Sequence, residues 1–149
     1  MLKLSKKMYY AVEAVLYIAY NTKTVPIASR DIAERQGLPP RYLEQIMQKL
    51  VRAGILRGVR GPRGGYVLAK ERRRISIADI CSVIRDEDEL PVEELQKTIL
   101  GHGVLLPICH ELSQRLSEEL AQIDVAQLCQ KATSKHIRRE HDAPMDFTI

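Results

Sequence analysis

Apolar residues in the first half of the chain recur with helical spacing. Between Pro40 and Gly54 they fall at i, i+3, i+4, i+7 and i+8, which places Leu43, Ile46, Met47, Leu50 and Val51 on one stripe. Pro40 suits a first helical turn, because the fixed φ and missing N–H of proline cost nothing there. The pattern predicts an amphipathic helix that ends near Gly54, with a polar and mostly basic outer face.

Two short β-prone runs follow this helix. Ile55 and Leu56 form the first run and residues 66–68 the second, and the residues between them are rich in glycine, proline and arginine. Such a pattern predicts a β-hairpin with a cationic tip.

A short helix is predicted upstream, between Ser29 and Gly37. Ser29 is placed as its N-cap, Ile32 and Ala33 form its buried face, and Gly37 ends it. Two helices at this spacing predict a helix-turn-helix, whose second helix lies in the DNA major groove. With the hairpin they form a winged helix. The alternative is a helical pair that only packs.

Further helices are predicted on both sides of this unit. They cover residues 6–22, residues 77–84 after a Ser76 cap, residues 91–100, residues 104–123, and a short segment that Asp124 caps. Residues 101–103 (Gly-His-Gly) are predicted to break the chain. The expected fold is mainly α with a small β-hairpin wing and a long C-terminal dimerisation helix.

The long helix carries a one-sided apolar stripe near the end of a small protein, a pattern that often packs against a second copy. The residues predicted to form the dimer interface are Leu105, Leu112, Leu116, Leu120 and Ile123. We therefore divide the chain into a DNA-binding domain over residues 1–84, an effector-loop region with the dimerisation helix over 85–131, and a disordered tail over 132–149.

Charge separates the two halves of the chain. Residues 1–74 carry 16 Lys and Arg against 5 Asp and Glu, a net charge of +11, whereas residues 75–149 have a net charge of −7. This asymmetry favours a polyanion partner for the first half over a randomly charged surface. The acidic run Asp86–Glu89 lacks the spacing of a calcium loop and is predicted to be a solvated loop.

Several other classes of protein have no support in the sequence. The first twenty residues lack a cleavage site, and no run is long enough to span a bilayer. Three cysteines without an export signal suggest a reducing cytoplasm. No nucleotide-binding glycine loop or catalytic constellation can be assigned, so we expect no enzyme activity.

Specific runs in the sequence resemble one bacterial repressor family. They are Pro40-x-Tyr-Leu-Glu-Gln-Ile46, Ala53-Gly-Ile-Leu56 and Arg60-Gly-Pro-x-Gly-Gly-Tyr-x-Leu-Ala69. The family includes regulators of iron–sulfur assembly, nitric-oxide response and cysteine metabolism (the IscR/NsrR/CymR type). The similarity is dense to about residue 85 and traceable to about residue 130. It implies a homodimer that binds double-stranded operator DNA.

The predicted DNA contacts follow from this fold. The major-groove candidates on the predicted helix are Arg41, Tyr42, Glu44, Gln45 and Gln48. Ser29 is expected to contact phosphate. Arg60 and Arg63 at the hairpin tip are expected to enter the minor groove, where arginine is favoured.

Cofactor chemistry is where the chain departs from the family. Many members bind an iron–sulfur cluster through three cysteines before the dimer helix, but residues 85–106 contain no cysteine here. Cys109 lies on the apolar stripe, which favours a packing role. Cys109, His102 and His110 are candidate metal ligands, and Cys81, Cys109 and Cys129 are candidate redox thiols.

The sequence therefore predicts a homodimeric, cytoplasmic, DNA-binding repressor without a typical iron–sulfur site. The alternatives are a regulator switched by a thiol, one with an atypically ligated cluster or metal, and a winged helix used only for protein contacts. The operator and the effector or partner protein are not predicted.

Overall fold

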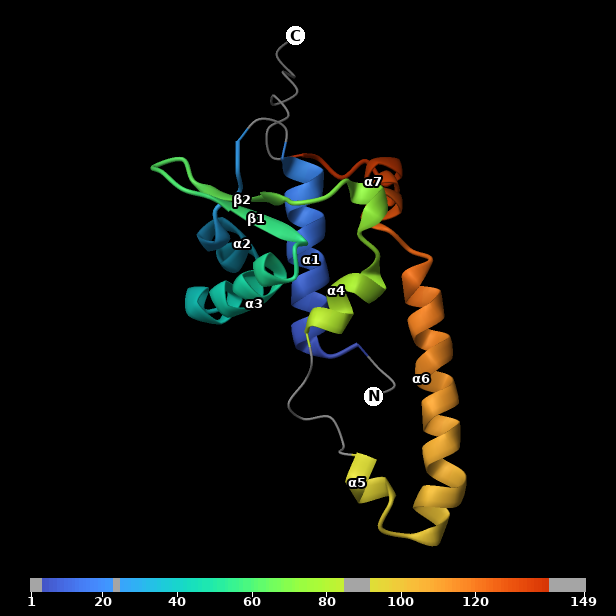
Figure 1. Cartoon of the computed structure of the whole chain (residues 1–149). Coiled ribbons are helices and arrows are strands. Elements are labelled where there is room, and N and C mark those ends of the chain that lie inside the picture. The colour runs from blue at the N-terminus through green and yellow to red at the C-terminus, as the bar shows by residue number, and fades with distance from the viewer. Residues whose placement is uncertain (1–3, 23–24, 85–91, 140–149) are drawn as a thin grey trace.

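The computed structural model describes residues 4–22, 25–84 and 92–139. The helices are α1 (Lys6–Asn21), α2 (Ser29–Gln36), α3 (Pro40–Arg52), α4 (Ile77–Val83), α5 (Val92–Leu95), α6 (Leu106–Ala121) and α7 (Val125–Ser134), with a 3-10 turn η1 (Arg72–Arg74) and a π-helical turn η2 (Gly101–Leu105). The strands are β1 (Leu56–Val59) and β2 (Gly65–Leu68). The predicted mainly helical fold with a hairpin wing is confirmed (Figure 1).

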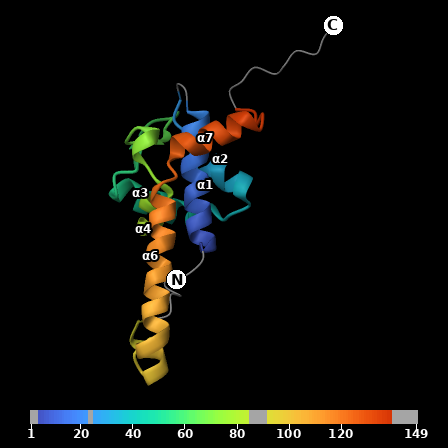
Figure 2. The same cartoon turned by 90° about the vertical axis from the view of Figure 1, so that its right-hand side faces the viewer.

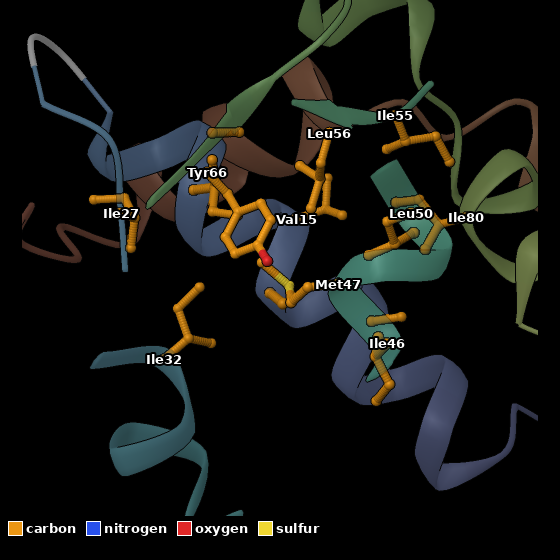
Figure 3. Close-up of a cluster of buried hydrophobic side chains, with 14 of the residues drawn as sticks. Val15, Ile27, Ile32, Ile46, Met47, Leu50, Ile55, Leu56, Tyr66 and Ile80 are labelled. Atoms are coloured by element: carbon orange, nitrogen blue, oxygen red, sulfur yellow. The ribbon is translucent and has the colours of Figure 1, made fainter. Parts of the chain in front are cut away.

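Helix α1 is the centre of the core. Ala11, Ala14, Val15 and Ile18 on one side of this helix are fully buried. The small alanine side chains let neighbouring elements pack close to the helix. Side chains from α2, α3, the wing and α4 converge on it (Figure 3). The shared cluster also includes Ile32, Leu43, Ile46, Met47, Leu50, Leu56, Ile75 and Ile80. The predicted apolar stripe of α3 is thus its core-facing side.

The wing is joined to the core by its second strand. β1 and β2 pair antiparallel, with Leu56 opposite Leu68 and Val59 opposite Gly65. Tyr66 of β2 also exchanges two backbone hydrogen bonds with Ile27, at 2.8 and 3.0 Å. This pairing brings the two backbones so close that a Cβ atom on Gly65 would lie 2.4 Å from the Ile27 carbonyl oxygen. The absence of a side chain at residue 65 therefore allows the wing to dock.

The turn between α2 and α3 agrees with the sequence, but the start of α2 does not. Gly37 ends α2 with a left-handed φ of 66°, which glycine adopts without strain. Ala28 is the N-cap, and Ser29 is the first helical residue with no capping hydrogen bond. The prediction of Ser29 as the N-cap was wrong, because its hydroxyl donates instead to Glu44.

The C-terminal helix returns to the first domain. Asp124 caps α7 through a capping box with Gln127, so the predicted cap of this helix is confirmed. Val125 and Cys129 are buried in the cluster around α1, and α7 lies beside α1 in both views (Figures 1 and 2). The last helix therefore contributes to the core formed by residues 1–84.

The predicted boundary of the disordered tail at residue 132 was too early. Helix α7 continues to Ser134, and the Tyr20 hydroxyl donates to the Ile137 carbonyl. The guanidinium of Arg139 lies 4.5 Å from the centre of the Tyr20 ring. These contacts with α1 order residues 132–139, and residues 140–149 lie outside the described residues.

Helix α6 contacts α4, and its N-terminal part extends beyond the other helices as an arm (Figures 1 and 2). The Gly-His-Gly sequence at 101–103 does not break the chain as predicted, because residues 101–105 continue into α6 as a π-helical turn. The helix predicted over residues 91–100 has only one turn, α5, among the described residues. The acidic run at 86–89 lies outside them. Over Leu106–Ala121 no residue is buried.

Candidate nucleic-acid interface

Helix α3 divides cleanly into two faces. The apolar side chains Leu43, Ile46, Met47 and Leu50 have no exposed surface, so the helix cannot rotate without uncovering them. The opposite face presents Arg41, Gln45 and Gln48 to solvent. An open depression beside this face is lined by Ser29, Arg30, Pro40, Arg41, Glu44, Gln45, Gln48, Lys49 and Arg52.

The wing extends the same surface. A second depression runs between the start of α2, the outer face of α3 and the hairpin, and Arg60 is among its lining residues. Arg60 and Arg63 are exposed on the hairpin loop. Ser29, Arg30, Glu44 and Gln48 line both depressions, which together form one cationic face. Of the predicted α3 and wing candidates, Tyr42 and Arg63 line neither depression.

A hydrogen-bonded network lies at the centre of this face. The Glu44 carboxylate accepts from the Tyr66 hydroxyl at 2.6 Å and from the Ser29 hydroxyl at 2.8 Å. The Gln48 amide Nε2 donates to the same carboxylate at 3.1 Å and to the Tyr66 hydroxyl at 3.3 Å. One carboxylate therefore links α2, α3 and β2. Figure 3 shows the Tyr66 side chain reaching from β2 towards α3.

The network also changes the acidity of its members. Partial burial tends to raise the pKa of the Glu44 carboxyl, but hydrogen bonds from Tyr66, Ser29 and Gln48 outweigh it and leave that pKa below its usual value. Burial, together with the adjacent Glu44 carboxylate, raises the pKa of Tyr66 to about 12. At neutral pH Glu44 is therefore an anion that accepts hydrogen bonds, and Tyr66 is a neutral donor.

Three predicted DNA contacts, Glu44 of the network above, Tyr42 and Ser29, are half-buried, whereas the others are exposed. Tyr42 is half-buried and packs against the core cluster. Ser29 is half-buried and directs its hydroxyl to Glu44. The structure also adds Arg30, Lys49 and Arg52 to the lining of the face. Lys49 and Arg52 lie off the apolar stripe in the sequence, whereas nothing local marks Arg30.

The predicted dimer residues run from Leu105 of η2 along α6 to Ile123, just beyond it, and fall into two groups. Leu105 and Leu112 are 52% and 43% exposed, whereas Leu116, Leu120 and Ile123 are half-buried. Val104 and Ile108, both 49% exposed, lie beside the first group and were not predicted. We call Val104, Leu105, Ile108 and Leu112 the arm patch. Its apolar side chains face solvent in the single chain.

The cysteines are spread over three elements. Cys81 of α4 and Cys129 of α7 are buried, Cys109 of α6 is half-buried, and all three are free thiols. Burial raises the pKa of both the Cys81 and the Cys129 thiol, in Cys129 despite the nearby Arg72 and Arg139. Both thiols are therefore protonated at neutral pH.

These side chains do not fit an iron–sulfur cluster. A cluster needs thiolates that converge on the iron atoms, and the chain has only these three cysteines, at 81, 109 and 129. Among residues 4–22, 25–84 and 92–139, no three or more His, Cys, Asp or Glu side chains come together to hold a metal ion. His102 and His110 are exposed near Cys109 without forming such a group.

A family model described as the iron-dependent transcriptional regulator Rrf2 matches residues 4–131. The chain belongs to the Rrf2 family. It is 31% identical to the HTH-type transcriptional regulator IscR of Escherichia coli O1:K1 over 152 aligned residues, which cover 99% of this chain and 94% of the relative. It is 33% identical to the IscR of Klebsiella pneumoniae, with 85% of this chain and 79% of the relative covered.

Solved structures agree with this assignment. The T. potens IscR structure has a TM-score of 0.72 at 31% identity, with 93% of each chain covered. The B. subtilis cysteine regulator CymR shares the fold, with a TM-score of 0.66 at 24% identity and coverage of 88% and 98%. The resemblance read from the sequence is confirmed, and this Rrf2 protein is a transcriptional regulator rather than an enzyme. None of its described helices is both long and apolar enough to cross a membrane.

Proposed function

We propose that this Rrf2 protein is a cytoplasmic, homodimeric repressor that binds operator DNA without an iron–sulfur cluster. The observation that carries the proposal is the continuous cationic face formed by α3, the start of α2 and the wing. Its arginines match the charge of phosphates, and its exposed α3 side chains have the hydrogen-bonding groups that read base edges.

The docking follows from the geometry of a winged helix-turn-helix. Helix α3 enters the major groove with Arg41, Gln45 and Gln48 towards the bases. Arg60 and Arg63 at the wing then reach the adjacent minor groove, whose negative potential attracts arginine. Occupation of a promoter by such a complex blocks transcription, which makes repression the simplest outcome.

A dimer is supported by the arm patch. One recognition helix reads only a few base pairs, and two helices related by a dyad read half-sites about one helical turn apart. In the single chain, η2 and α6 expose the apolar side chains of the arm patch, and no residue of α6 is buried. A second copy that covers the patch would remove this apolar surface from water.

The cluster-free state is proposed because the chain lacks a suitable donor set. Anaerobic purification followed by iron and sulfide analysis and a visible spectrum tests it. We expect a colourless protein that binds DNA. Near-stoichiometric iron with a visible band that disappears in Cys109→Ala would overturn this part of the proposal and assign Cys109 as a ligand.

The function itself is tested by selection from random DNA duplexes. Purified full-length protein should enrich a sequence with two related half-sites, and the selected duplex should bind far more tightly than a shuffled one. Binding should weaken steeply as salt rises, because phosphate contacts release counterions. Equal affinity for selected and shuffled duplexes would exclude a sequence-specific regulator. Transcription from a promoter that carries the selected site distinguishes repression from activation.

A further inference from the structure

The hydrogen bonds of Gln48 determine which way its side-chain amide faces. Its Nε2 lies 3.1 Å from the Glu44 carboxylate and 3.3 Å from the Tyr66 hydroxyl. A primary amide nitrogen has two hydrogens, and these two acceptors use both of them. A carboxylate can only accept, so the amide nitrogen of Gln48, and not its oxygen, must face Glu44.

Tyr66 closes this arrangement into a cycle. Its hydroxyl donates its single hydrogen to Glu44 at 2.6 Å and therefore accepts from Gln48 through a lone pair. Ser29 donates to the other carboxylate oxygen at 2.8 Å. Rotating the amide of Gln48 by half a turn would place its oxygen against two oxygen atoms and lose two hydrogen bonds.

The group that remains for DNA is an acceptor. Gln48 is exposed, and in the described part of the chain no side chain or backbone group donates to its Oε1. A free glutamine recognises adenine through one donor and one acceptor together. Here the donor is already used, and the neighbouring Glu44 contributes only further acceptor oxygens. At the Gln48 position, α3 therefore presents lone pairs to solvent.

On the basis of the proposed DNA-binding function, we propose that Glu44 determines base specificity by orienting Gln48 through the network with Tyr66. With its oxygen outward, Gln48 selects a base that presents an exocyclic amino group in the major groove, the N4 amino group of cytosine or the N6 amino group of adenine. The O6 and N7 atoms of guanine and the O4 atom of thymine are acceptors and would face the lone pairs of Gln48. Glu44 acts as a positioning residue, and Gln48 makes the contact.

The test is selection from a pool of duplexes with a random core, carried out with the parent protein and with Gln48→Ala and Glu44→Gln. The position whose preference disappears in Gln48→Ala is the one that Gln48 reads. In the parent, replacing the cytosine or adenine of the selected pair with an analogue that lacks the exocyclic amino group should weaken binding, because that group is the expected donor to Gln48. In Glu44→Gln, the amide at residue 44 can donate or accept, so Gln48 can turn over. The preference at that position should then fall about tenfold, while other positions keep theirs.

Two further variants test whether Glu44 acts by orienting Gln48 or only by stabilising the fold. Tyr66→Phe keeps the buried ring but removes one acceptor of the Gln48 amide, so it should relax the same position by a smaller factor. Gln45→Ala removes the adjacent exposed amide of α3 and should alter a different position. Circular dichroism and thermal unfolding establish that each variant is folded.

Four outcomes overturn this inference alone. They are no position lost in Gln48→Ala, full affinity for a duplex whose selected pair lacks the exocyclic amino group, an unchanged preference in Glu44→Gln, and an equal loss at every position. If Glu44→Gln does not fold, an unchanged preference in Tyr66→Phe overturns the inference. A parent protein that enriches no sequence overturns the proposed function, and the inference with it.

Discussion

The DNA-reading face, which is the cationic face formed by α3, the start of α2 and the wing, differs from the α6 arm in how the rest of the chain fixes its side chains. On the DNA-reading face, the inner side of α3 is fully buried and apolar. Its outer side is hydrogen-bonded through Glu44 to α2 and β2. Along α6, no residue of the helix is buried and apolar side chains face solvent. One region is complete within a single chain, whereas the other leaves apolar surface that a second copy can cover.

The largest effect is expected from a charge placed in the arm patch. Leu112→Glu should leave the protomer folded, because Leu112 is 43% exposed in the single chain. In a dimer the unpaired carboxylate would be buried, which should weaken self-association by about 3–5 kcal/mol. Sedimentation velocity measures the change. Gln114→Glu places the same charge at another exposed position of α6 and serves as the control.

If Leu112→Glu sediments as the parent dimer does, the arm patch is not the interface. Loss of the dimer should also remove high-affinity binding to a two-half-site duplex. A single chain would then bind each half-site independently.

On the DNA-reading face, the largest effect is expected at the contact between the wing and the core. In Gly65→Ala the new Cβ would lie 2.4 Å from the Ile27 carbonyl oxygen, a backbone atom that cannot turn away. We expect the free energy of unfolding to fall by about 3 kcal/mol, at the upper end of overpacking effects. Urea denaturation measures the change.

The same hairpin provides the control for that experiment. In Gly58→Ala the added methyl group meets no atom within 4 Å, so stability should stay within about 0.5 kcal/mol of the parent value. If both variants lose the same amount of stability, the close approach of β2 to Ile27 is not the reason that Gly65→Ala is destabilised.

Removal of a wing arginine should affect binding and spare folding. Arg60→Ala should weaken binding to the selected duplex by about 2 kcal/mol, the scale of one specific contact. Stability should not change, because Arg60 is exposed on the hairpin loop. Titration at constant salt gives the affinity. Arg74→Ala removes the same charge from the exposed part of η1 and should have less effect; equal losses would contradict a minor-groove role for the wing.

The smallest effect is expected from titration of Glu44. Its pKa is lower in the folded protein than in the unfolded chain, so its contribution to stability is present above the unfolded pKa and is lost as pH falls through the folded one. Between about pH 5 and pH 3, stability should decrease more steeply in the parent than in Glu44→Gln. Denaturation curves at several pH values compare the slopes. Parallel slopes would show that the network does not stabilise the carboxylate.

The sequence alone was enough to predict the winged helix, and the reason is local. The apolar spacing of residues 43–51, the Gly37 stop and the Ser76 and Asp124 caps depend on neighbours within a few residues. The exposed positions of Arg41, Gln45 and Gln48 follow from the same spacing, since a stripe on one face leaves the other face to solvent. The prediction of a break at residues 101–103 also rested on the local sequence. It was wrong because Gly101 and Gly103 lie in a π-helical turn.

Other features were decided by residues far apart in the chain. Ser29 is not a cap because its hydroxyl donates a hydrogen bond to Glu44, fifteen residues later. Tyr66 of the wing donates to the same carboxylate. Residues 132–139 are ordered because Tyr20 of the first helix contacts Ile137 and Arg139. Spacing along a sequence shows which face of a helix is apolar. Only the packed chain shows which hydroxyl, carboxylate and amide meet, because that depends on how separate helices and strands approach one another.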